Sequence, residues 1–222
     1  ALILRRRFKR QVTVAYGGII GRAENREMVR SLRLPLSHLR NVNKRNYTAF
    51  AMVDCQPWSG NSQLPRTVVP DLVIDHHPLR KSTLAAATVD VRPRYGATAT
   101  ILAEYLEASG LKPSRALATG LVYAIRSETQ DFGREAAGPD HAAFDGLLPR
   151  IDRRMLARIQ SAPEAAESID VRRFFGRLCE RYGDAVRVTF DGAPERLTIN
   201  PDHLETATHN LIDNAVRHGQ GR

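Results

Sequence analysis

Long hydrophobic runs, cysteines and lysines are scarce in this sequence. No apolar run approaches the roughly 20 residues that a membrane-spanning helix needs, so we expect no membrane partner. The opening ALILRRRFKR places four apolar residues before its charges, which is not the pattern of a secretory signal. The two cysteines, Cys55 and Cys179, lie far apart without a pairing pattern, which favours the reducing cytoplasm.

Positive charge is plentiful but unevenly distributed. The 33 Lys and Arg residues outnumber the 24 acidic residues and give a net charge of +9. Residues 1–50 alone hold 12 basic and 2 acidic residues, so the surplus is local. Such a surplus suits an acidic partner such as nucleic acid, but it is equally typical of a solvated helix face. Only 4 of the basic residues are lysine, which coding bias explains as well as phosphate binding does.

The order of predicted elements indicates an α/β fold with a parallel sheet flanked by helices. Apolar strands are predicted at 11–18, 48–55 and 71–75, with an amphipathic helix at 24–34 between the first two. Further helices are predicted at 1–8, 96–110, 114–125 and across 140–160. The Pro/Gly/Ser/Asn-rich stretch 56–70, which contains Trp58, is predicted to be a surface loop.

Polar side chains follow two of these strands. The segment DLVIDHHP ends an apolar run in Asp75, His76 and His77, whose carboxylate and imidazole groups suit divalent transition metals. Asp54 ends the strand TAFAMVDC, and neighbouring parallel strands would bring Asp54 and Asp75 to one edge. The alternatives are a surface His–Asp hydrogen bond, and a turn or helix cap at Asp54.

DLVIDHH resembles the signature of the DHH phosphoesterase family, which includes RecJ-type exonucleases, nanoRNases and inorganic pyrophosphatases. VDC at 53–55 is similar to the family's second motif, and GATAT at 96–100 resembles its segment after DHH. GLVYAIRSETQDF at 120–132 is similar to the fourth motif, with Glu128 where the family usually has Asp. The opening motif, a His followed by D-x-D-A, is missing. The resemblance therefore predicts an N-terminally truncated DHH domain over 1–160.

This resemblance implies a hydrolase that uses Mn2+ (or Mg2+) against short oligonucleotides or nucleotide phosphates. Asp54, His76 and His77 would be the catalytic residues. The implied metal ligands are Asp54, Asp75, His76 and Glu128, with Asp131 as the alternative to Glu128. Fewer anionic ligands than the family has would leave a weaker site, for a single ion. A homodimer is one assembly that this interpretation permits.

The character of the sequence changes at Ser161. SAPEAAES begins a predicted linker, 161–169, before a partial α+β segment over 170–222. That segment should contain a helix at 171–182, strands at 186–190 and 197–200, and a helix at 201–218.

NPDHLETATHNLIDNAVRHG, within the last predicted helix, is similar to the N-box of histidine-kinase ATP-binding domains. By that resemblance Asn214 would coordinate the Mg ion of ATP, Asn210 would lie near the phosphates, and Arg217 or His218 would face the phosphates. Because only the leading half of such a domain is present, binding of ATP with Mg should be weak. On spacing alone, an asparagine pair four residues apart is usually solvated.

Three functions therefore remain open from the sequence. The first is a DHH-type phosphoesterase that depends on the segment around Asp75. The second is a nucleotide-binding signalling fragment that depends on Asn210 and Asn214. The third is a catalytically inactive fusion fragment.

Overall fold

A computed structural model describes most of the chain. The described residues are 1–59, 64–133, 136–163, 167–182, 187–189, 191–192, 195–199, 204–205, 207–208 and 211–212. The chain forms two compact units, one of residues 1–17 with 28–160 and one of residues 18–27 with 161–222. Parallel strands accompanied by helices make the fold α/β, which confirms the predicted class.

The central sheet of the first unit has three parallel strands in the order β3-β4-β5. β3 is Ala51–Val53, β4 is Leu72–Asp75 and β5 is Thr88–Val91. Val53 pairs with Ile74, so Asp54 and Asp75 leave the sheet at the same edge. The predicted juxtaposition of these two acids is confirmed.

The first predicted strand does not join this sheet in the part of the chain that the structure describes. β1, Val14–Tyr16, pairs in parallel with β2, Leu36–His38, as a separate sheet. The sequence pattern predicted one parallel sheet that contains β1 together with β3 and β4, and this was wrong for the described residues. The prediction missed β2 because that strand is short, partly polar and preceded by Pro35. It also missed β5, where Asp90 interrupts the apolar pattern.

In the described residues before Ser161, the α-helices are α1 Leu2–Arg7, α2 Ala23–Ser31, α3 Thr98–Ala108, α4 Arg115–Glu128, α5 Gly138–Leu147 and α6 Arg153–Gln160. Short 3-10 turns lie at Leu39–Asn41, Lys44–Asn46, Lys81–Ala85 and Leu148–Arg150. Ser114 caps α4, because its Oγ accepts from Leu117 N at 3.2 Å. Gly110 follows α3 with φ +66°, the left-handed conformation that glycine permits.

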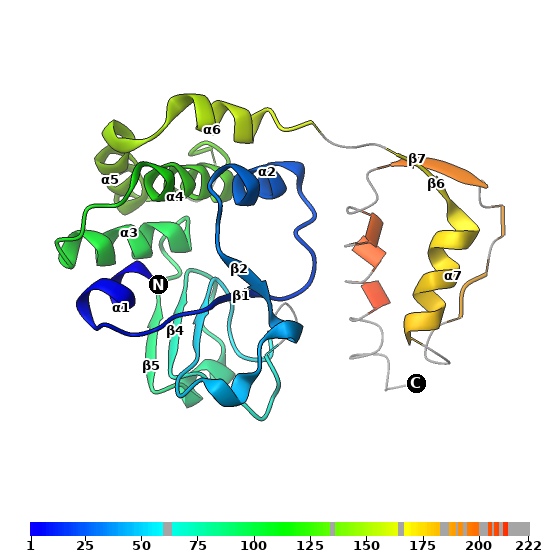
Figure 1. Ribbon diagram of the computed structural model, residues 1–222, viewed down its shortest axis with the longest axis horizontal. Helices are drawn as coiled ribbons and strands as arrows, with labels where there is room; N and C mark the ends of the chain where they lie inside the picture. Colours follow the sequence, from blue (N-terminus) through cyan, green and yellow to red (C-terminus); the bar gives the residue numbers. More distant parts are fainter. Residues whose placement is uncertain are drawn as a thin grey trace. The chain divides into compact units, whose positions relative to one another are not determined.

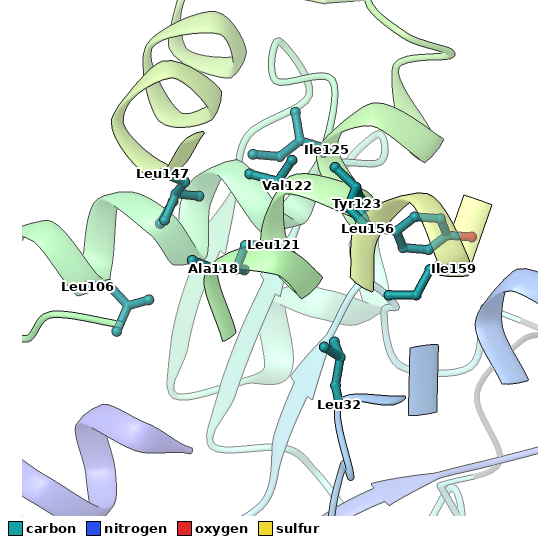
Figure 2. Packing of buried hydrophobic residues seen from close by; sticks show 12 residues of the cluster. Leu32, Leu106, Ala118, Leu121, Val122, Tyr123, Ile125, Leu147, Leu156 and Ile159 are labelled. Atoms are coloured by element: carbon teal, nitrogen blue, oxygen red, sulfur yellow. The ribbon is translucent and has the colours of Figure 1, made fainter. Parts of the chain in front are cut away.

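The main hydrophobic core lies around α4, which packs against α3, α5 and α6 (Figure 1). Figure 2 shows Val122 and Ile125 of α4 near Leu147 of α5 and Leu156 of α6. Ile125 is completely buried, as is Ile159 at the end of α6. This core fixes the helices whose ends border the central sheet.

The second unit contains β6, Glu167–Asp170, paired antiparallel with β7, Arg196–Ile199, and the helix α7, Val171–Tyr182. β6 begins inside the predicted linker 161–169, because Ile169 pairs with Leu197. Residues 187–189, the described part of the strand predicted at 186–190, are not in a strand. Asn210, Asn214, Arg217 and His218 lie outside the described residues.

Within the described part of the chain, no helix combines the length and apolar character that crossing a membrane requires.

Candidate metal centre

Asp54 lies immediately after β3 and is held towards α3. Its backbone N–H donates to Ile74 O at 2.9 Å, so the ladder with β4 continues to this residue. Its φ of 61° turns the chain, and its side chain remains 49% exposed. Thr98 Oγ1, in the first turn of α3, donates to Asp54 Oδ1 at 2.7 Å. The carboxylate is therefore fixed in direction but accessible.

The two ring nitrogens of His76 differ in their hydrogen bonding within the described part of the chain. Its Nδ1 lies 3.1 Å from Tyr95 O, and since a carbonyl oxygen only accepts, Nδ1 carries the proton. The other nitrogen, Nε2, is buried and has no hydrogen-bond partner among the described residues. It lies 3.7 Å from Asp54 Oδ1. A buried polar atom without a partner needs an explanation, and a lone pair facing a carboxylate fits a metal ligand.

Asp75 is 1% exposed and organises the turn after β4. Its Oδ1 accepts from His76 N and from His77 Nδ1, both at 2.8 Å, and its Oδ2 accepts from Gln56 Nε2 at 2.7 Å. Burial by itself raises the pKa of Asp75, but the hydrogen bonds from His77 and Gln56 outweigh it and leave that pKa lowered. The hydrogen bond to Asp75 raises the pKa of His77.

These four side chains gather as one candidate centre. Asp54, Asp75, His76 and His77 each offer a ligand atom, and these atoms lie within 4.8 Å of one another. Two carboxylates and two imidazoles match the donor preferences of divalent transition metals. The buried Nε2 of His76 has no hydrogen-bond partner among the described residues. The four side chains therefore fit a metal ion better than they fit a group held together by hydrogen bonds alone.

Glu128, the remaining predicted ligand, does not belong to this group. It is the exposed last residue of α4, and its charge contributes to the raised pKa of His77. Asp131, its alternative, accepts a hydrogen bond from Arg126 Nε. The two carboxylates lie where the helix ends, and the structure does not bring either into the cluster of described ligand atoms.

Gln56 is a buried residue of the site that the sequence analysis missed. It was assigned to a surface loop, yet it is only 2% exposed. Its Nε2 donates to Asp75 and to Pro78 O, at 3.1 Å for the second. Its Oε1 accepts from Arg80 N at 2.9 Å and from Thr83 Oγ1 at 2.6 Å. No periodic pattern marks such a residue, because the partners of its side chain all lie in the later segment 75–83.

A cavity of about 360 Å³ lies beside the cluster. It is lined by Cys55, Gln56, Ser59, Asp75, His77, Pro78, Leu79 and Arg80. Burial, with the nearby charges of Asp54 and Asp75, raises the pKa of the Cys55 thiol to about 11. The thiol is therefore protonated at neutral pH and is a poor nucleophile there. The volume is within the range of small-ligand pockets.

Comparison with known proteins adds a relative but no activity. No known family model matches this chain. The chain is 38% identical over 159 residues to the uncharacterized protein MJ1633 of Methanocaldococcus jannaschii, an alignment that covers 71% of this chain and 32% of that protein. The chain thus matches about a third of the relative's length.

The Asp75–His77 pair predicts a stability optimum in mildly acidic solution for the metal-free protein. The lowered pKa of Asp75 stabilises the fold above the unfolded value of about 4, and this contribution is lost as pH falls through the folded pKa. The raised pKa of His77 stabilises the fold below about 6.5, and this contribution is lost as pH rises through the folded pKa. The contribution of this pair to stability should therefore be highest between about pH 4 and pH 6.5.

Urea unfolding in the presence of a chelator, repeated across this pH range, measures that profile. His77→Ala should remove the decline on the alkaline side, because it deletes the group whose pKa is raised. The decline should be shallow, since the side chain of His77 is 52% exposed and partly screened by water. Identical profiles for the wild type and His77→Ala would contradict this account.

Proposed function

We propose that this chain is a metal-dependent phosphoesterase of the DHH type, which hydrolyses short oligonucleotides or small nucleotide phosphates. The observation that carries the proposal is the orphaned Nε2 of His76, buried 3.7 Å from Asp54 within a group of two carboxylates and two imidazoles. The resemblance of VDC and DLVIDHH to the family's motifs supports it, because these motifs supply the same four residues.

The four residues have different roles in this proposal. Asp54 and His76 would hold a divalent ion, Mn2+ or Mg2+, through an accessible carboxylate oxygen and the free Nε2. Asp75 would accept the hydrogen bond from Nδ1 of His77 and so keep its own carboxylate and the His77 ring close to the ion. Water would be activated for attack on phosphorus when such an ion is bound. The neighbouring cavity, with Arg80 in its lining, offers space and positive charge for a phosphate group.

Removing the Asp54 carboxylate should abolish manganese-stimulated hydrolysis. The purified chain is incubated with dinucleotides and with phosphoadenosine phosphate, in manganese or in excess chelator, and product is measured. Asp54→Ala should lower the rate at least about 100-fold, since a catalytic metal contributes several kcal/mol to transition-state stabilisation. Asp145→Ala, which removes an exposed carboxylate of α5, is the matched control and should retain activity.

Two outcomes would contradict the proposal. Hydrolysis that persists in chelator, or in Asp54→Ala, would show that the reaction does not use this cluster. A folded wild-type chain that hydrolyses neither substrate with manganese would favour the inactive-fragment alternative.

A further inference from the structure

Asp140 is a fully buried carboxylate, 0% exposed, that the proposed chemistry does not use. It lies in the first turn of α5. Its Oδ1 accepts from Thr100 Oγ1 at 2.5 Å, and its Oδ2 accepts from Gly96 N and Ala137 N, both at 2.8 Å. These three donors are uncharged groups that solvate the carboxylate through hydrogen bonds.

One of these donors belongs to the peptide that holds His76. The N–H of Gly96 and the C=O of Tyr95 are parts of the same peptide unit, and the described chain contains no cis peptide bond. In a trans peptide these two groups point in opposite directions. Asp140 therefore contacts one side of the Tyr95–Gly96 peptide, while His76 Nδ1 contacts the other at 3.1 Å.

Hydrogen bonds arranged in series polarise one another. A carboxylate that accepts the peptide N–H makes the carbonyl of the same peptide a stronger acceptor. A stronger acceptor favours the proton on His76 Nδ1 and leaves the lone pair on Nε2, the atom that faces Asp54. In known metal sites, partners behind a ligating histidine fix its tautomer and ring orientation in this way.

We propose that Asp140 is a positioning residue that acts through the Tyr95–Gly96 peptide to hold His76 with Nδ1 protonated and Nε2 free for metal. The predicted effect of Asp140 on metal affinity rests on the proposed function. The predicted effect on the His76 tautomer does not, because the tautomer can be measured without metal.

Asp140→Asn preserves the shape of the side chain and removes its charge. In the metal-free protein at about pH 8, where imidazole is neutral, 15N NMR of the wild type should show His76 protonated at Nδ1. In Asp140→Asn these signals should move towards a mixture of both tautomers. Calorimetry with Mn2+ should show about 10-fold weaker binding, the lower end of the loss usual for such partners.

Thr100→Val is the matched control. It removes a different donor from the same buried carboxylate and leaves the Gly96 contact in place. We expect it to destabilise the fold while leaving the His76 tautomer and the manganese affinity unchanged. Equal changes in Thr100→Val and Asp140→Asn would overturn the proposal, because Asp140 would then act only through stability.

The other possible results of these experiments also decide whether Asp140 positions His76. An unchanged tautomer in folded Asp140→Asn overturns the proposal. If Asp140→Asn does not fold, a coupling across the hydrogen bond from Gly96 N to Asp140 Cγ in the wild type, together with the Nδ1-protonated tautomer, supports it, and the absence of either overturns it. A wild type that binds no Mn2+ would remove the proposed function, whereas the tautomer experiment would still decide the role of Asp140.

Discussion

Replacing His76 with alanine is expected to lower manganese affinity at least about 100-fold. Loss of a partner behind a ligand already costs about 10- to 100-fold, and His76→Ala removes the proposed ligand itself. The loss should be specific, because Nε2 is the one atom of the cluster that is buried without a hydrogen-bond partner among the described residues. Calorimetric titration of the purified chain with Mn2+ measures the effect directly.

His38→Ala is a suitable control for this experiment. His38 ends β2, its ring packs edge-on against Tyr16 at 5.2 Å, and it lies outside the cluster. The control should bind manganese as the wild type does. Manganese binding that survives in His76→Ala would refute the assignment of the centre, whereas equal loss in both variants would indicate general disruption of the fold.

Replacing Gln56 with leucine should destabilise the protein by about 3 kcal/mol, because each buried group that loses its partner costs about 1–3 kcal/mol. Leucine has a similar volume but makes none of the four hydrogen bonds of the Gln56 amide. Asp75 would lose a donor while remaining buried, and Arg80 N and Thr83 Oγ1 would lose their acceptor. Urea unfolding monitored by circular dichroism measures the change.

The same variant should weaken manganese binding about 10-fold, since Asp75 and His77 would no longer be held in one orientation. Gln160→Leu, at the exposed end of α6, is the control and should alter stability by less than about 0.5 kcal/mol. A destabilisation in Gln56→Leu no larger than in this control would show that the buried amide does not support the site.

The closeness of Asp54 and Asp75 could be predicted because the sequence patterns that indicate it are local. Each acid ends an apolar segment of strand character, and parallel strands end at a common edge. Gln56 and Asp140 could not be predicted in the same way. Gln56 meets Asp75 across 19 residues of sequence, and Asp140 meets Gly96 across 44, so no spacing pattern connects them. Glu128 illustrates the reverse, since a motif position suggested a ligand that the end of α4 leaves outside the cluster.

The sequence by itself determined the α/β class, the approximate positions of most helices, and the gathering of two acids and two histidines at one sheet edge. These features follow from apolar periodicity and capping, which act over a few residues. Tertiary structure decided that β1 pairs with β2, that Gln56 is buried, and that Nε2 of His76 is the nitrogen left free. These properties depend on hydrogen bonds between segments far apart in the chain, which no short-range pattern in the sequence records.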